Sequence, residues 1–175
     1  MKILYVGRYE LPDKDATANR VVADAKLLRD LGHEVVLAGW SDTVRKSDGY
    51  KKAEYFSFES YEKHRESGVL DKFHTFSDAE RELELLRRVP FDLVIAYNYP
   101  AVAFRKIFKY CRAHSIKCIA DVTEWFSNGN ANPLLRVVKA YDSHLRMKKL
   151  HRQVDGLIVI SEYLEKYYAG QKMVR

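Results

Sequence analysis

The residues of this chain that could take part in chemistry are polar side chains that follow short apolar runs. They form four groups along the sequence: Gly7 and Arg8 with Asn19 and Arg20; Asn98 and Tyr99; Asp121, Glu124 and Trp125; and Ser161. A carboxylate can accept the proton of an attacking hydroxyl, and an arginine can offset negative charge that develops on a phosphate. Each residue also has a structural alternative, because asparagine can shape a turn, aspartate can brace a loop and serine can cap a helix.

Several well-defined kinds of site are excluded because the sequence lacks their motifs. The dinucleotide fingerprint G-x-G-x-x-G needs three glycines at the first turn, whereas Gly7 is followed here by Arg8 and Tyr9. The sequence contains no G-x-x-x-x-G-K-[ST] loop, no H-E-x-x-H and no G-x-S-x-G. The two cysteines, Cys111 and Cys118, lack metal-ligand spacing and are too few for a disulfide framework. We therefore expect neither a metal ion nor a cofactor.

The elements that must position these side chains follow from the hydrophobic pattern. Six strands are predicted, at Lys2–Gly7, Glu34–Gly39, Ala53–Phe58, Asp92–Tyr97, Ile116–Asp121 and Gly156–Ile160. Helices are predicted between most of them, over about residues 18–31, 77–88, 101–114, 133–152 and 162–168. Asp15 or Thr17 is suited to cap the first helix.

Strands that alternate with helices predict an α/β fold with a doubly wound parallel sheet, Rossmann-like, in the strand order 3-2-1-4-5-6. In such a sheet, ligands bind beyond the carboxyl ends of the strands, at the switch point between the first and fourth strands. The four polar groups all follow strand ends or the helix start next to them. We therefore expect them to converge on one edge of the sheet.

Size and composition set limits on the whole chain. Its 175 residues suit one domain. No apolar run approaches the roughly 18–20 residues that span a bilayer, and the N-terminus lacks the pattern of a signal peptide, so we expect a cytoplasmic protein. The formal charge of +6 permits an anionic partner. No recognised nucleic-acid motif accompanies that charge, so we expect no nucleic-acid partner.

The predicted helix from Pro133 to Arg152 is distinctive for its charge. It carries one acid, Asp142, and six basic residues: Arg136, Lys139, Arg146, Lys148, Lys149 and Arg152. Its apolar residues include Leu134, Val138, Tyr141 and Leu145. A basic amphipathic helix can lie peripherally on an anionic membrane, here the inner face, or bind phosphates. It can equally present a solvated face over a sheet. The sequence does not decide between membrane binding, phosphate binding and a solvated face.

Several stretches resemble one known family, the GT-B-fold retaining glycosyltransferases usually numbered family 4, in their N-terminal domain. Asn19-Arg20 heads a helix that ends in Leu31-Gly32-His33-Glu34-Val35, which is similar to the family's L-x-x-x-G-H-x-V stretch. Phe91-Asp92-Leu93-Val94 and the Glu124-Trp125 loop also match in order. The most specific match is Val154–Leu164, which resembles the family's end-of-domain strand and S-x-x-L helix.

The resemblance implies transfer of a sugar from a nucleotide-sugar donor to a saccharide or lipid-linked acceptor, in polysaccharide or glycolipid synthesis and without a metal. It assigns Asp121 or Glu124 a catalytic role. Gly7, Arg8, Asn19, Arg20, Asn98, Tyr99, Trp125 and Ser161 are assigned to binding of the acceptor or the donor phosphate. Two departures stand out: many relatives have paired glycines where this chain has Gly7-Arg8, and a histidine where it has the segment from Asp121 to Glu124.

The resemblance also implies a domain plan. Residues 1–170 are expected to form the acceptor-side domain and residues 171–175 the start of an interdomain linker. The nucleotide-sugar is then held chiefly by a C-terminal domain that lies outside this sequence. We expect the isolated 175-residue chain to be inactive and to self-associate through apolar surface that the missing parts would cover. The alternatives are a fragment of a GT-B-fold sugar-nucleotide epimerase and a non-catalytic ligand-binding module.

Overall fold

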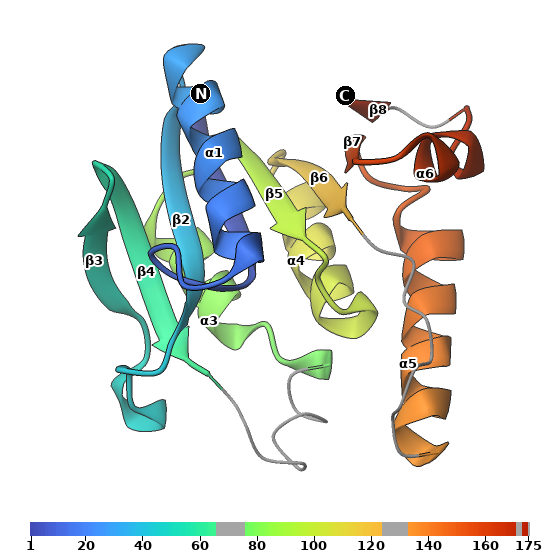
Figure 1. Ribbon diagram of the computed structural model, residues 1–175, viewed down its shortest axis with the longest axis horizontal. Helices are drawn as coiled ribbons and strands as arrows, with labels where there is room; N and C mark the ends of the chain where they lie inside the picture. The colour runs from blue at the N-terminus through green and yellow to red at the C-terminus, as the bar shows by residue number, and fades with distance from the viewer. Residues whose placement is uncertain (66–75, 124–132, 171–172, 175) are drawn as a thin grey trace.

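An eight-stranded sheet forms the centre of the computed structural model, which describes residues 1–65, 76–123, 133–170 and 173–174 (Figure 1). The strands are β1 (Lys2–Glu10), β2 (Glu34–Ser41), β3 (Lys51–Tyr55), β4 (Phe58–His64), β5 (Leu93–Tyr97), β6 (Lys117–Val122), β7 (Gly156–Val159) and β8 (Met173–Val174). Their order across the sheet is β3-β4-β2-β1-β5-β6-β7-β8. All neighbouring pairs are parallel except β3 and β4.

Helices cover both faces of the sheet. They are α1 (Ala16–Asp30), α3 (Glu80–Arg88), α4 (Ala101–Ala113), α5 (Pro133–Leu145) and α6 (Glu162–Tyr167), with a short 3₁₀ turn η1 (Lys46–Asp48) and a π-helical turn η2 (Arg146–Leu150) that continues α5. Helix α1 lies in front of the sheet and α4 behind it (Figure 1). The side chains of β1 alternate accordingly: Ile3 and Tyr5 join the core under α1, whereas Leu4 and Val6 join the core under α3 and α4.

This architecture is the expected doubly wound α/β fold, and the predicted order is confirmed for β2, β1, β5, β6 and β7, which are neighbours in that sequence. The predicted third strand, 53–58, overlaps β3 in residues 53–55, and its predicted place beside β2 is wrong. Phe56 and Ser57 have left-handed φ angles of 54° and 64° and form the turn between β3 and β4. The strand that pairs with β2 is β4, which buries Ser60 and Glu62 as well as Phe58. Because polar residues occupy the buried face of this strand, its sequence does not show the alternating hydrophobicity that predicts a strand.

Strand β1 is longer than predicted. It continues past Gly7 to Glu10, so Arg8 lies in the strand and not in the expected loop. A register shift between Val6 and Glu10 lets the Tyr9 ring turn into the core, where its hydroxyl donates to the Tyr5 carbonyl at 2.5 Å. Gly7 makes room for this ring, because a Cβ on Gly7 would lie 2.9 Å from a Tyr9 ring carbon and 2.8 Å from Cβ of Tyr97.

Replacing Gly7 with alanine is therefore expected to destabilise the fold by about 1–3 kcal/mol, since the added methyl overpacks a site bounded by Tyr9 and Tyr97. Urea denaturation followed by circular dichroism measures the change. Gly32→Ala is the control for backbone strain without overpacking. Nothing lies within 4 Å of the Cβ position of Gly32, so only its φ of +84° disfavours an alanine there. If Gly7→Ala costs as much in a Tyr9→Leu background as in the unsubstituted chain, the contact with the Tyr9 ring is not the cause.

The C-terminal part of the chain begins with α5 on the right of Figure 1 and ends at β8. The long basic helix predicted for residues 133–152 is present as α5 followed by η2. Met173 and Val174 pair with Leu157 and Ile158 of β7 and extend the sheet. In the part of the chain that the structure describes, none of the helices combines the length and the apolar character needed to cross a membrane.

Candidate functional site

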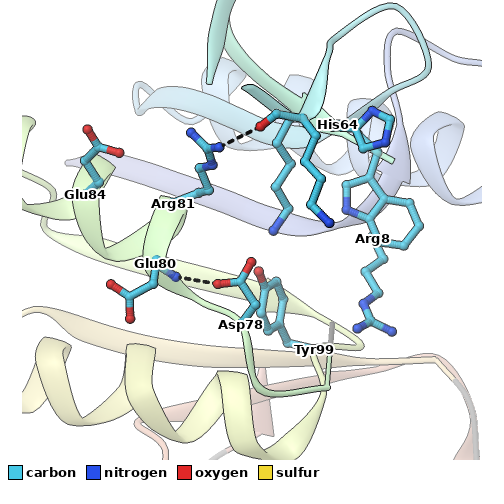
Figure 2. A pocket seen from close by; sticks show the side chains of 10 residues that line it. Arg8, His64, Asp78, Glu80, Arg81, Glu84 and Tyr99 are labelled. Atoms are coloured by element: carbon cyan, nitrogen blue, oxygen red, sulfur yellow. Dashed lines mark hydrogen bonds between the residues drawn. The ribbon is translucent and has the colours of Figure 1, made fainter. Parts of the chain in front are cut away.

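Among the residues that the structure describes, two neighbouring cavities open at the carboxyl edge of the sheet. The larger, of about 420 Å³, lies beside the ends of β2 and β4 and against α3 (Figure 2). We call it the β4 cavity. It is lined by Arg8, Trp40, Lys46, Lys63, His64, Asp78, Glu80, Arg81, Glu84 and Tyr99. Donors, carboxylates and one indole ring therefore surround the same space, which is the combination that hydroxyl-rich ligands can use.

A buried carboxylate supports the inner wall of the β4 cavity. Glu82 of α3 is 1% exposed and accepts hydrogen bonds from Lys63 Nζ at 2.6 Å and the Tyr50 hydroxyl at 3.1 Å. Burial by itself would raise the pKa of Glu82, but the charge and hydrogen bond of Lys63, together with the hydrogen bond from Tyr99, outweigh burial and the pKa is lowered. Burial is the larger cause of the raised pKa of Tyr99, and the ionised Glu82 raises that pKa further. Lys63 is thus held by a fixed partner at the end of β4.

The smaller cavity, of about 210 Å³, lies at the switch point of the sheet, and we call it the switch-point cavity. It is lined by Arg8, Phe76, Asn98, Pro100, Lys139, Asp142, Ser143 and Arg146. Arg8 therefore lines both cavities. Its guanidinium carbon lies 5.6 Å from the centre of the Trp40 ring and 5.7 Å from that of Phe76. Stacking between two rings fixes this cation where the cavities meet.

Asp142 and Arg146 form the floor of the switch-point cavity, one helical turn apart. Arg146 is only 1% exposed, and its guanidinium donates to the carbonyl of Asn98 at 3.4 Å. The Asp142 carboxylate accepts the first amide of α4, from Ala101, at 2.7 Å. Burial raises the pKa of Asp142, and the charge of Arg146 partly offsets that rise. The two residues thus join α5 to the start of α4 and to the turn after β5.

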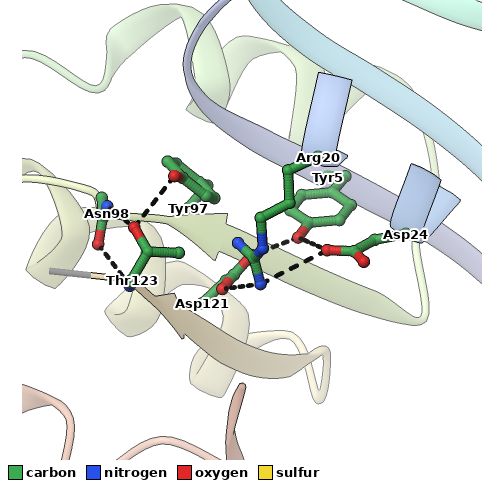
Figure 3. Close-up of polar contacts among 7 residues, drawn as sticks. All are labelled: Tyr5, Arg20, Asp24, Tyr97, Asn98, Asp121 and Thr123. Atoms are coloured by element: carbon green, nitrogen blue, oxygen red, sulfur yellow. Dashed lines mark hydrogen bonds and ion pairs between the residues drawn. The ribbon is translucent and has the colours of Figure 1, made fainter. Parts of the chain in front are cut away.

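Asp121, at the end of β6, lies in a second polar cluster on the α1 side of the sheet (Figure 3). Arg20 binds both of its oxygens, at 2.8 and 3.0 Å, and the Tyr5 hydroxyl donates to one of them. Asp24, one turn further along α1, lies 3.5 Å from Arg20. The Asp121 side chain has no exposed surface. An arginine fork on a buried carboxylate positions β6 against α1.

In this cluster the positive charge of Arg20 compensates the negative charge of Asp121. Burial raises the pKa of Asp121, and the hydrogen bonds from Arg20 and Tyr5 offset only part of the rise. Burial would lower the pKa of Arg20, but Asp121 reverses that effect and the pKa is raised. With both carboxylate oxygens engaged and no exposed surface, Asp121 has the geometry of a positioning residue in this conformation.

Asn98 and Thr123 tie the ends of β5 and β6 together. Asn98 has a left-handed φ of 40°, and its side-chain amide donates to Thr123 Oγ1 at 2.6 Å. Its side-chain oxygen accepts the Thr123 amide at 3.2 Å, and its own backbone amide donates to the Asp121 carbonyl at 2.9 Å. These bonds fix the turn that borders the switch-point cavity.

The structure brings some of the predicted site residues together and leaves others apart. Arg20, Asn98 and Asp121 meet at the ends of β5 and β6, and Arg8 shares one cavity with Asn98 and the other with Tyr99. Glu124 and Trp125 lie outside the described residues.

Three of the predicted binding residues have local structural roles. Asn19 is exposed and donates to the carbonyls of Asp13 and Asp15 at the start of α1. Ser161 caps α6 by accepting the Leu164 amide at 3.3 Å, which is its structural alternative. Gly7 provides room for its neighbours and lies opposite Tyr97 in the sheet. Asp15, one of the two predicted caps of α1, accepts the Ala18 amide at 2.6 Å.

Sequence reasoning missed Glu82, Asp142 and Arg146. All three are charged residues in helices whose sequences look solvated, and all three are buried. One signal was available for Asp142, the single acid among six basic residues. Among the described residues, no three His, Cys, Asp or Glu side chains are grouped so that they could hold a metal ion.

Comparison with known proteins gives a fold but no family. The sequence matches no protein-family model, and no curated protein matches it. Among solved structures, the chain is similar to the sucrose-phosphate synthase of Thermosynechococcus elongatus, with a TM-score of 0.64 and 12% identity. The match covers 99% of this chain and 47% of the synthase. The fold is that of one Rossmann-like half of a GT-B glycosyltransferase. This chain thus spans about half the length of the similar synthase.

Proposed function

We propose that this chain is the acceptor-binding, N-terminal domain of a retaining, nucleotide-sugar-dependent glycosyltransferase of family 4 type. The sugar passes to a saccharide or lipid-linked acceptor in polysaccharide or glycolipid synthesis. The donor is held chiefly by a second Rossmann-like domain that follows residue 175, and no metal takes part. The observation that carries the proposal is the pair of cavities that meet at Arg8, on the carboxyl edge of a sheet with a GT-B half-fold.

The division of labour follows from the chemistry of the two cavities. The β4 cavity offers the Trp40 ring together with donors and acceptors, so it suits the hydroxyls and apolar face of a sugar. The switch-point cavity offers three cations, Arg8, Lys139 and Arg146, against one carboxylate, so it suits a phosphate. Arg8, at the junction, then lies between the acceptor and the leaving phosphate, where its charge stabilises the transition state.

The test uses the protein that carries both domains. With a panel of UDP- and GDP-sugars and oligosaccharide or lipid-linked acceptors, we expect release of nucleoside diphosphate that depends on the acceptor. Arg8→Ala should lower kcat/KM at least about tenfold, a loss of about 1.4 kcal/mol of transition-state stabilisation, and Arg8→Lys should lower it less. Lys51→Ala, on the exposed edge strand β3, is the matched control and should leave kcat/KM unchanged.

The alternatives give different results in the same assay. An epimerase interconverts sugar nucleotides without any acceptor, and a binding module binds ligand without turnover. The 175-residue chain alone should release no nucleotide. Turnover by the chain alone, or an unchanged kcat/KM in Arg8→Ala, contradicts the proposal.

A further inference from the structure

The positive charge of this chain is concentrated in two neighbouring helices. Residues 101–114 and 133–153, which include α4, α5 and η2, contain ten of the 30 lysines and arginines but one of the 24 acids. The rest of the chain therefore holds 20 basic and 23 acidic residues. The single acid of the two helices, Asp142, is buried. The net charge of +6 thus comes entirely from α4, α5 and the residues next to them.

A groove of about 500 Å³ runs between these helices, and we call it the α4–α5 groove. Arg105, Lys109 and Arg112 line it from α4, and Lys149 lines it from η2. All four side chains are exposed. The lining includes no carboxylate. The groove therefore has three cations on its α4 side and one on the opposite side, without the alternating acids that a solvated helix surface usually carries.

Exposed apolar side chains lie next to these cations. Val137 and Tyr141, one turn apart on α5, are 68% and 66% exposed. Leu145 and Lys149 continue the same stripe at intervals of four residues, and Tyr141 and Leu145 line the groove. Phe108 and Leu150 are buried at its floor. The face thus combines a basic rim with an apolar and aromatic stripe.

We propose that this face docks on an anionic lipid surface, with the phosphates of the headgroups bound by the four cations of the groove and the Val137–Tyr141 stripe inserted at the boundary with the acyl chains. Cations near an anionic membrane each add attraction. Tyrosine and aliphatic side chains favour the interface of a bilayer. A nucleic acid would use the cations but would leave the apolar stripe in water, so the lipid surface accounts for both features.

The membrane face and the switch-point cavity lie on two sides of the same helix. Tyr141 and Leu145 line the groove, whereas Lys139, Asp142 and Ser143 line the cavity. This proposal stands on charge and exposure and holds whether or not the chain belongs to a glycosyltransferase.

The experiment measures partition of the purified chain onto vesicles of phosphatidylcholine alone and of phosphatidylcholine with about 30% phosphatidylglycerol. We expect binding to the anionic vesicles only, with loss in high salt. Lys109→Gln with Lys149→Gln should weaken it about 30-fold, at about 1 kcal/mol for each cation. Lys26→Gln with Lys51→Gln removes the same charge from exposed positions on α1 and β3 and is the matched control. Val137→Ser with Tyr141→Ser should also weaken binding, with the salt dependence retained.

Circular dichroism establishes that each variant is folded. Equal binding to neutral vesicles, equal losses in the control and groove variants, or no binding to anionic vesicles overturns the proposal. Tighter binding to a single-stranded RNA than to anionic vesicles, lost in the lysine variant but not in the Val137 and Tyr141 variant, also overturns it and makes the face a nucleic-acid surface.

Discussion

Replacing Arg20 with alanine is expected to lower the free energy of unfolding by about 3–5 kcal/mol near pH 7.5. The variant leaves Asp121 fully buried beside Asp24, with only the Tyr5 hydroxyl as a partner. Removing one member of a buried ion pair costs this much because the remaining charge is uncompensated. Urea denaturation measures the change. Arg88→Ala, which removes an exposed arginine paired with Glu84 on α3, is the control and should cost at most about 0.5 kcal/mol.

The deficit of Arg20→Ala should depend on pH. Because the pKa of Asp121 is raised in the fold, the stability that its protonated form contributes is present at low pH and is lost as the pH rises through that pKa. Without Arg20 the pKa rises further, so the deficit is largest near pH 7.5 and shrinks towards pH 5. His151, with its pKa lowered by burial to about 3, destabilises both proteins in acid. The comparison is therefore the difference between them at each pH.

A double variant separates charge from packing. Arg20→Leu with Asp121→Asn removes both charges and should recover most of the stability lost in Arg20→Ala. A deficit that does not change with pH, or a double variant as unstable as the single one, would show that Arg20 acts through packing alone.

Replacing Asp142 with alanine is expected to cost a similar 3–5 kcal/mol. The variant leaves Arg146, which is 1% exposed, without the carboxylate one turn before it, and it deprives the Ala101 amide of its acceptor. Asp142→Asn keeps an oxygen for the amide but not the charge, so its loss should be intermediate. Thermal and urea denaturation both report the change.

The control for Asp142 lies on α6. Lys166→Ala breaks an exposed pair with Glu162 at 3.7 Å and should change the stability by no more than about 0.5 kcal/mol. If Asp142→Ala is as stable as Asp142→Asn, the hydrogen bond to Ala101 contributes nothing measurable. If both variants are as stable as the unsubstituted chain, Asp142 does not stabilise the buried charge of Arg146.

The parts of the fold that the sequence predicts are those in which burial and hydrophobicity coincide. Strands β1, β5 and β6 are apolar runs buried on both faces, and their places in the sheet are confirmed. Strand β4 was missed because Ser60 and Glu62 occupy its buried positions. The extension of β1 was missed because a register shift turns Tyr9 inwards, and a register shift has no hydrophobic signature.

The sequence predicts which edge of the sheet carries the candidate site, but it does not predict the contacts within the site. The rule for parallel sheets places Arg8, Asn98 and Asp121 near one another, and they do lie at that edge. It does not say that Arg20 saturates Asp121, or that Arg146 lies buried under the turn of Asn98. Those pairings join residues 101 and 48 positions apart in the sequence, and only the packed structure creates them.

Arg8 lies within β1, between Gly7, which pairs with β5, and Glu10, which pairs with β2, and this has a thermodynamic consequence. A cation on a free loop loses backbone entropy when a ligand fixes it, at about 1–2 kcal/mol for each residue ordered. The extension of β1 to Glu10 has already ordered Arg8 during folding. Association with an anionic ligand at this edge should therefore proceed with little loss of backbone entropy, and calorimetry should show a small unfavourable entropy of binding.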